Sequence, residues 1–282
     1  MKTIDFHTHV FPPGFRNHRD AFLPDEPAFA SIYASPKAKL AGAGELLSQM
    51  DEGGVSRSVI FGFPWEKNDH YRRHNDYILE AVERYPDRLI GFCCFSPRSR
   101  GGAEEAARCL NAGMSGVGEL AFYGSDLSDG ASDALEDVMA VCFEHACPLL
   151  LHTNEPVGHA YPGKAPMTLR QIYRFVKKYP SNRIVLAHWG GGLFFYSLMK
   201  KEVKGALKNV WFDTAASPFL YLPGVYRLAG ELVGYDKILF GSDYPLLKPE
   251  RYFKDMQAAN LPEPSLSRIR GLNAMDLLGL NA

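Results

Sequence analysis

Eight short apolar segments recur along the chain with longer amphipathic segments between them, and this pattern restricts the folds open to it. They span residues 3–9, 58–62, 89–95, 116–120, 149–152, 184–188, 210–213 and 238–241. Several are continuous runs of Val, Ile, Leu and Phe, as is typical of parallel strands buried on both faces. Helices are expected over residues 75–85, 132–146, 167–179, 192–201, 226–232 and 266–278. This alternation predicts an α/β fold, a single-domain (β/α)8 TIM barrel over residues 1–282.

The segment after the first predicted strand argues against the main alternative, a doubly wound open sheet. Such a sheet usually carries a Gly-rich, phosphate-binding turn at this point, whereas residues 10–14 are Val-Phe-Pro-Pro-Gly. The longest irregular stretch, residues 11–39, begins here. It follows the first strand, on the face of the barrel where active sites lie. It is therefore a lid, a wall of the substrate site, or an excursion that packs on the barrel without a functional role.

Composition narrows the classes of partner. The chain has 31 basic and 32 acidic side chains and a formal net charge of -1, which argues against nucleic acid as the main ligand. No apolar stretch approaches the roughly 18 residues needed to span a bilayer. The first ten residues include Asp5 and two histidines, unlike a signal peptide. The five cysteines lack zinc-ribbon spacing, which predicts buried free thiols in a reducing compartment. A cytoplasmic protein without a membrane partner is therefore expected.

His7 and His9 end the first predicted strand. Side chains alternate between the faces of a strand, so both imidazoles point the same way and are placed to hold one metal ion. A His-x-His pair alone is weak evidence for a metal site, because ordinary packing also produces it. Polar residues at later strand ends strengthen the hypothesis.

The later strand ends carry Glu119, His152 and His188, and Asp243 follows the eighth strand. The C-terminal strand ends of a barrel meet at one mouth, so these side chains can converge. Each alone could be a core histidine, a paired glutamate or a turn aspartate, but burying all of them without partners is costly. Nitrogen and carboxylate ligands suit zinc, manganese, iron or nickel, with zinc as the default.

A bound metal would lower the pKa of a water molecule toward about 7 and so supply hydroxide at neutral pH. Asp243 is expected to bind the metal and to accept the proton of that water. His188 is either a further ligand or a group that polarises the substrate. Asp243 and His188 are thus the predicted catalytic residues.

Four motifs together resemble the amidohydrolase superfamily over the whole chain. They are Asp-Phe-His-Thr-His at residues 5–9, His-Thr-Asn at 152–154, Ala-His-Trp-Gly-Gly at 187–191 and Gly-Ser-Asp-Tyr-Pro at 241–245. Within this superfamily the chain is most similar to the amidohydrolase-related group ("amidohydrolase 2"). The resemblance implies a metal-dependent enzyme, since that group contains hydrolases, lactonases and non-oxidative decarboxylases of aromatic or unsaturated acids.

The resemblance also implies a ligand set. His7, His9, His152 and Asp243 match the ligands of a mononuclear centre, and His188 matches the histidine that acts beside the metal or binds a second ion. No lysine ends the fourth strand, so a carbamylated lysine is not expected. Glu119 instead resembles the glutamate that bridges two metals in TatD-like hydrolases. A two-metal centre would place His7, His9, Glu119 and Asp243 around one ion and Glu119, His152 and His188 around the other, and one or two ions remain open.

Two predicted loops offer substrate contacts. The loop after the fifth strand carries Asn154, His159, Tyr161 and Lys164, and the cationic loop after the second strand carries Trp65. Cationic and aromatic groups suit an anionic or aromatic ligand, although a solvated loop without a role is equally compatible. A small, partly apolar, anionic substrate is predicted.

The first hypothesis for the activity is hydrolysis of an amide, ester or lactone by metal-bound hydroxide. The alternative is non-oxidative decarboxylation of an aromatic or unsaturated acid, in which His188 or Asp243 protonates the ring. A TatD-like phosphodiesterase is disfavoured by the near-neutral charge. A run of aromatic residues at 194–196 allows a homodimer, but a packed helix explains it equally well.

Overall fold

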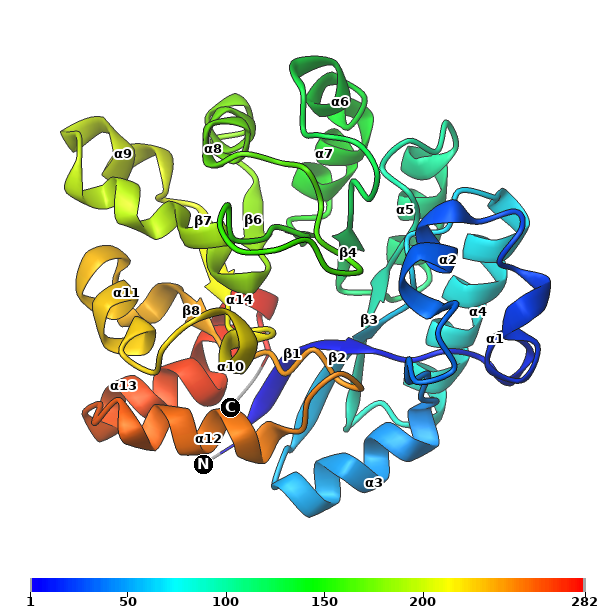
Figure 1. The fold of residues 1–282 in the computed structure, drawn as a ribbon, viewed down its shortest axis with the longest axis horizontal. Helices are drawn as coiled ribbons and strands as arrows, with labels where there is room; N and C mark the ends of the chain where they lie inside the picture. The colour runs from blue at the N-terminus through cyan, green and yellow to red at the C-terminus, as the bar shows by residue number, and fades with distance from the viewer. Residues whose placement is uncertain (1, 281–282) are drawn as a thin grey trace.

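The computed structural model describes residues 2–280 and contains one eight-stranded parallel sheet in the order β1 to β8. Backbone hydrogen bonds join its two ends, because Phe6 N donates to Phe240 O (2.7 Å) and Asp243 N donates to His7 O (2.9 Å). The sheet therefore closes, and the helices surround it (Figure 1). The predicted (β/α)8 barrel is confirmed. The strands are β1 (Ile4–His9), β2 (Arg57–Phe61), β3 (Leu89–Cys93), β4 (Gly116–Leu120), β5 (Pro148–Leu151), β6 (Arg183–Leu186), β7 (Val210–Asp213) and β8 (Ile238–Leu239).

The helices include several that hydrophobic periodicity did not predict, namely α3 (Ala43–Gly53), α5 (Gly102–Asn111) and α12 (Pro249–Ala258). Those expected are α4 (Asn68–Arg84), α8 (Leu169–Lys178) and α11 (Val225–Val233), of which α4 begins seven residues before the predicted start at residue 75. The helix predicted over 132–146 is divided into α6 (Asp129–Asp133) and α7 (Glu136–Glu144). The last predicted helix comprises α13 (Glu263–Ser267), the π turn η4 (Arg268–Leu272) and α14 (Asn273–Leu278).

The helix predicted over 192–201 is replaced by an irregular turn. The segment η2 (His188–Leu198) contains four consecutive residues with left-handed backbone, Trp189 to Gly192, with φ between 61° and 94°. Glycine is required at Gly191, because a Cβ there would lie 2.3 Å from Asn154 O. Helix α9 (Lys201–Ala206) follows this turn. The turn after β6 thus lies so close to the loop after β5 that the helix expected from the sequence does not form there.

The apolar core has two layers. Side chains such as Phe6, Val59 and Leu150 fill the barrel interior, and α14 packs against one end of it through Ala274 and Leu277. A larger cluster joins the outer face of the sheet to the surrounding helices. All five cysteines are buried free thiols, as predicted.

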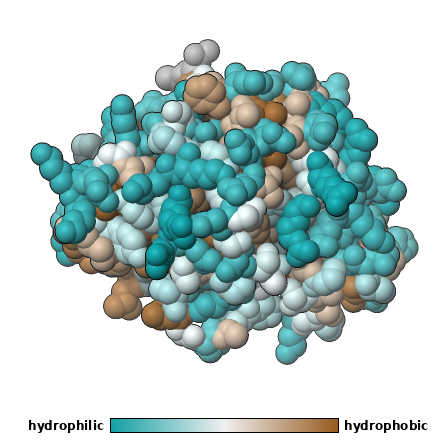
Figure 2. Space-filling model, turned by 90° about the horizontal axis from the view of Figure 1, so that it is seen from above, coloured by the Kyte–Doolittle hydropathy of each residue, from teal (hydrophilic) through white to brown (hydrophobic). Residues whose placement is uncertain are grey.

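The surface viewed in Figure 2 is mostly hydrophilic, with small hydrophobic groups interspersed and a few at its edge. Within residues 2–280, no helix combines the length and apolar character that a membrane span requires.

The long segment after β1 folds into α1 (Pro13–Asn17), η1 (Arg19–Ala21) and α2 (Pro27–Tyr33) beside the start of α4 (Figure 1). The buried carboxylate of Glu26 fixes it there, accepting hydrogen bonds from Glu66 N (2.9 Å) and Lys67 N (3.0 Å). His70 Nδ1 also lies 2.8 Å from this carboxylate. We call this segment, residues 11–39, the excursion, and the buried carboxylate holds it against the barrel.

Candidate metal centre

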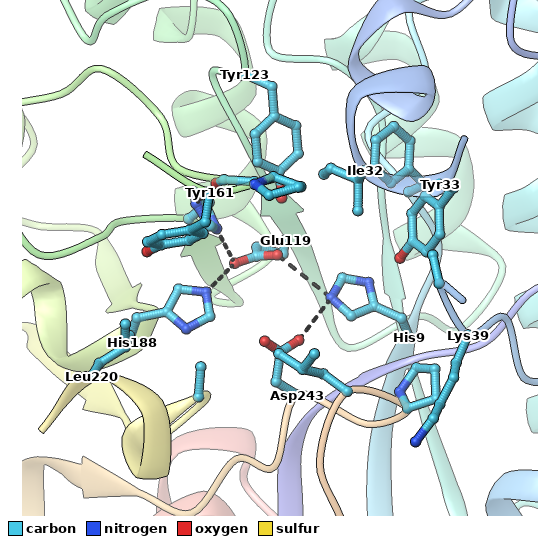
Figure 3. A pocket seen from close by; sticks show the side chains of 18 of the residues that line it. His9, Ile32, Tyr33, Lys39, Glu119, Tyr123, Tyr161, His188, Leu220 and Asp243 are labelled. Atoms are coloured by element: carbon cyan, nitrogen blue, oxygen red, sulfur yellow. Dashed lines mark hydrogen bonds and ion pairs between the residues drawn. The ribbon is translucent and has the colours of Figure 1, made fainter. Parts of the chain in front are cut away.

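Two histidines and two carboxylates converge at the C-terminal ends of the strands, and three of them, His9, Glu119 and Asp243, are seen in Figure 3. His7 Nε2 and His9 Nε2 each lie 3.5 Å from Asp243 Oδ1 and 3.6 Å from Glu119 Oε2. They come from β1, β4 and the turn after β8, three segments that are far apart in the sequence. Together with His188, which follows β6, the structure thus brings together five of the six predicted ligands.

Each histidine is oriented by a hydrogen bond from its other ring nitrogen. His7 Nδ1 donates to Asp213 Oδ2 (2.8 Å), and His9 Nδ1 donates to Gly62 O (3.1 Å). This arrangement leaves each Nε2 facing the centre. His7 Nε2 is buried and has no hydrogen-bond partner within residues 2–280. A buried nitrogen without a partner is what an ion would satisfy, so the residues present fit a divalent metal.

Asp213, at the end of β7, is the main residue that sequence reasoning missed. Besides His7, its buried carboxylate accepts hydrogen bonds from His188 N (2.9 Å) and Ala215 N (3.0 Å). It therefore fixes the His7 ring and the backbone of His188 at once. The signal that could have found it is the one used for Glu119, a carboxylate at the C-terminal end of a predicted strand.

His188 joins a second group of donors, with His7 and Glu119. Its Nδ1 donates to Ala215 O (3.0 Å), and its Nε2 lies 3.4 Å from Glu119 Oε1. Trp189, the next residue, donates from its indole to the Ser217 hydroxyl. The left-handed turn after β6 thus aims the imidazole at the same centre.

His152 lies at the edge of this cluster, with one ring nitrogen toward Glu119 and the other toward the loop after β5. Its Nδ1 is 2.9 Å from Glu119 Oε1, and its Nε2 is 2.9 Å from Gly163 O. Both ring nitrogens face acceptors of the protein itself. The groups of metal-ligating atoms within residues 2–280 do not include His152. The geometry therefore differs from the ligand role that the resemblance implied.

The electrostatics of the cluster reflect paired opposite charges. Burial opposes ionisation of Asp243, but the hydrogen bond from His9 and the charges of His7 and His188 lower its pKa to about 2. Burial also opposes protonation of His7, but Asp213, Glu119 and Asp243 raise its pKa to about 10. Anionic oxygens held against imidazoles are the environment in which a divalent cation displaces protons.

A cavity of about 420 Å³ lies over these donors. His9, Glu119, His152, His188 and Asp243 line its base, and Lys37 and Lys39 add positive charge to its wall. The rest of the wall is mostly aromatic and aliphatic (Figure 3), with Ile32, Tyr33, Phe63, Tyr123, Leu220 and Leu246. The excursion after β1 is therefore a wall of the cavity. Tyr33, Tyr123 and the two lysines were not predicted individually as contacts.

The predicted contacts from the β5 loop lie mainly within the loop itself. Tyr161 lines the cavity, but its hydroxyl donates to Glu155 Oε2 (2.8 Å). Lys164 Nζ binds Glu155 Oε1 (2.8 Å), and the buried Asn154 side chain accepts from Ala165 N (2.7 Å). His159 is exposed and is not among the lining residues. These polar groups hold the shape of the loop.

Trp65 is fully buried and does not line the cavity, which differs from the expected substrate contact. Its indole packs against Phe15 and Phe29, with ring centroids 4.8 and 4.6 Å away, and its Nε1 donates to His74 Nδ1 (2.8 Å). The pattern of charged neighbours suggested an exposed loop, but the aromatic residues of the excursion cover this indole.

A parallel barrel with imidazole and carboxylate donors at its C-terminal end defines the class of metal-dependent barrel enzymes. Residues 4–280 match the amidohydrolase family model, so the chain belongs to the amidohydrolase family. The resemblance drawn from the four motifs is thereby confirmed.

Two relatives align with most of the chain. The gamma-resorcylate decarboxylase of Polaromonas sp. strain JS666 is 24% identical over 292 residues, covering 82% of this chain and 86% of that protein. The 2-amino-3-carboxymuconate-6-semialdehyde decarboxylase of Dictyostelium discoideum is 22% identical over 340 residues, covering 99% and 92%. These relatives favour the decarboxylase alternative over the hydrolase hypothesis.

A solved structure extends the comparison. The dihydroxybenzoic acid decarboxylase of Polaromonas sp. JS666, with bound manganese and the inhibitor 2-nitroresorcinol, aligns with a TM-score of 0.73. It is 19% identical, and the alignment covers 100% of this chain and 98% of that one. The donor groups described above fit a divalent metal in this chain. They do not single out zinc, which the sequence favoured by default.

Proposed function

We propose that this protein is a divalent-metal-dependent, non-oxidative decarboxylase of an aromatic or unsaturated carboxylic acid. The observation that carries the proposal is the alignment of most of the chain with two decarboxylases. An enzyme of the amidohydrolase family can also hydrolyse its substrate, so the assignment depends on the relatives and on the character of the cavity.

The cavity suits a small planar acid. Phe63 and Tyr123 stack beside it, with ring centroids 5.9 Å apart and planes inclined by 12°. An apolar wall of this kind packs against a ring, while the polar base receives the carboxylate. Lys37 and Lys39 supply positive charge that attracts an anion.

The metal would be held by His7, His9 and Asp243. Glu119 and His188 form a neighbouring group of donors that shares His7. When bound, the metal supplies Lewis acidity that holds and polarises substrate oxygens. Asp213 orients His7 for this role, and Gly62 O orients His9. These contacts fix the donors before the substrate arrives, which limits the reorganisation needed during the reaction.

The reaction exchanges a carbon–carboxylate bond for a carbon–hydrogen bond. The electron pair of the breaking bond stays on the substrate carbon, CO2 leaves, and that carbon takes up one proton. We assign delivery of the proton to His188, whose Nδ1 is bound to Ala215 O so that its Nε2 faces the cavity. Asp243, at the same base, is the alternative donor considered from the sequence, but its pKa is lowered to about 2, so it carries no proton at neutral pH.

The test is a panel of acids and esters. The manganese-loaded protein is incubated with carboxyl-labelled 2,6-dihydroxybenzoate and related aromatic acids, and with aryl esters, lactones and a phosphodiester. Release of labelled CO2 with one solvent deuterium in the product is expected, and chelator should abolish it. Hydrolysis of esters without release of CO2 from any acid would contradict the proposal and restore the hydrolase hypothesis.

A homodimer and a cytoplasmic location also belong to this proposal. Phe194 is buried, but Phe195, Leu198 and Met199 are 44%, 70% and 65% exposed at the end of η2, and a second copy would cover them. Light scattering measures the mass in solution.

Five free thiols are typical of a reducing compartment and support the cytoplasmic location, which cell fractionation tests.

A further inference from the structure

Tyr33, the last residue of α2, presents its hydroxyl to the cavity from the excursion after β1 (Figure 3). The hydroxyls of Tyr71 and Tyr161 donate to protein groups. That of Tyr33 forms no hydrogen bond within residues 2–280 and points toward the space beside His9. A phenol so placed is available to a bound molecule.

The ring of Tyr33 is held firmly. Phe29, Phe11 and Phe63 surround it, with centroid distances of 4.9, 5.4 and 5.7 Å. Its backbone is also fixed, because Arg19 Nη1 donates to Tyr33 O (3.3 Å). The same guanidinium nitrogen donates to Ser35 O (2.9 Å), which closes the end of α2. The hydroxyl is therefore positioned before any ligand binds, and little conformational entropy is lost when it forms a hydrogen bond.

The protonation state of Tyr33 makes it a donor. Burial and the negative charges of Asp243 and Glu119 raise the pKa of this phenol above its ordinary value. The group keeps its proton across the neutral range and can donate to an oxygen of a ligand. A site that offers a donor discriminates strongly against a ligand that lacks the acceptor, because the buried donor is then left unpaired.

Several other polar groups of the cavity wall are less able to donate a hydrogen bond to a bound molecule. The hydroxyl of Tyr161 and the ammonium group of Lys164 are both bound to Glu155. Lys37 and Lys39 are exposed, and their long side chains are not held in one position by ion pairs within residues 2–280. Tyr33 is a rigid donor on the wall that faces the metal ligands; Tyr123, whose ring lies between Phe63 and His152, lines the same cavity nearer to His152.

We propose that the Tyr33 hydroxyl determines substrate specificity by donating a hydrogen bond to an oxygen substituent on the ring of the acid. This inference rests on the proposed function, since it assumes that the ring lies against the apolar wall with its carboxylate toward the metal. Tyr33 takes no part in breaking or forming covalent bonds. It selects oxygenated rings over plain ones.

The test compares two nitro compounds that differ in ring hydroxyls, 2-nitroresorcinol and nitrobenzene, titrated calorimetrically into the manganese-loaded protein. The wild-type protein should prefer 2-nitroresorcinol. Tyr33→Phe removes one oxygen and keeps the ring that packs on Phe29, so affinity for 2-nitroresorcinol should fall by about tenfold, the worth of one hydrogen bond. Affinity for nitrobenzene should not fall and should rise if anything, because the variant no longer leaves a buried hydroxyl unpaired. Tyr173→Phe removes a buried, unpartnered hydroxyl from α8 and serves as the control, with both affinities unchanged.

The outcomes separate this inference from the proposed function. No preference in the wild-type protein, or equal weakening of both ligands by Tyr33→Phe, would overturn the role of Tyr33, whatever reaction the protein catalyses. A selective loss of 2-nitroresorcinol binding would support that role. If the same preparation released no CO2 from any acid, only the proposed decarboxylation would be overturned.

Discussion

Asp213 shows how one unpredicted residue can organise a metal centre. Its carboxylate binds the His7 ring and two backbone amides, including that of His188. Asp213→Asn keeps the shape but removes the charge, and its amide nitrogen cannot accept the hydrogen bond. We expect metal affinity to fall by about 10- to 100-fold, as for other partners of metal-bound histidines, with the fold retained. Competition with a chromophoric chelator measures the affinity.

A matched control for this variant is Asp87→Asn, which changes a carboxylate that is 96% exposed in the turn before β3. Its metal affinity should equal that of the wild-type protein. If Asp213→Asn also bound metal with wild-type affinity, Asp213 would not position the ligands.

His74 provides a prediction about stability and pH. It is fully buried, accepts from Trp65 Nε1 (2.8 Å) and donates to Val10 O (2.6 Å), and burial lowers its pKa from 6.5 to about 3. As pH falls below 6.5, the unfolded chain takes up a proton that the folded protein cannot bind, so stability falls toward pH 3. The slope from this residue is about 1.4 kcal/mol per pH unit.

Urea unfolding at pH 7 and pH 5 measures this contribution of His74. The wild-type protein should lose about 2 kcal/mol more than His74→Gln between these values, because glutamine does not titrate. His159→Gln alters an exposed imidazole and should keep the wild-type slope. Equal slopes for the wild-type and His74→Gln proteins would show that His74 is not held neutral.

At the scale of elements, Glu26 joins the excursion after β1 to the first residues before α4. Its fully buried carboxylate accepts hydrogen bonds from Glu66 N and Lys67 N and lies 2.8 Å from His70 Nδ1. Anionic groups are favourable at helix N-termini, where amides lack partners. Glu26→Gln places an amide donor against these donors, so the free energy of unfolding should fall by about 1–3 kcal/mol.

The effect of Glu26→Gln should reach the cavity as well, because α2 carries Tyr33. We expect a raised KM for the substrate along with the loss of stability measured in urea. Glu66→Gln changes an exposed side chain next to the same amides and is the control, with little change expected in either quantity. Wild-type stability in Glu26→Gln would contradict the anchoring role.

The strands and the candidate ligands at their ends were predictable from the sequence, and several helices were not. Buried parallel strands form continuous apolar runs, and a polar residue such as Glu119 or His188 at the end of a run is conspicuous. Helices such as α3 and α5 bury small or polar residues, including Gln49 and Ala106, which do not stand out as core residues in the sequence. The position of Tyr33 depends on contacts between distant segments, which no local pattern reveals.

For the whole molecule, the donor geometry limits the number of metal ions. Both groups of donors at the strand ends contain His7, whose Nδ1 is already bound by Asp213, so both depend on His7 Nε2. One nitrogen lone pair binds one ion. In a third group, Cys93, Glu105 and Cys109, the carboxylate of Glu105 is already bound by Asn75 and Arg108. A second centre built from Glu119, His152 and His188 would need a free nitrogen on His152, but its ring faces Glu119 and Gly163 O.

We therefore predict one divalent ion per chain, measured by elemental analysis of protein purified without chelator or immobilised nickel. Glu119→Ala should keep about one ion, because His7, His9 and Asp243 still form a three-donor group. His9→Ala removes one of these donors and should lose most of the metal. About two ions in the wild-type protein, falling to one in Glu119→Ala, would instead establish the bridged centre that Glu119 suggested. That result would require His152 to turn from Gly163 O toward a second ion, with displacement of the β5 loop.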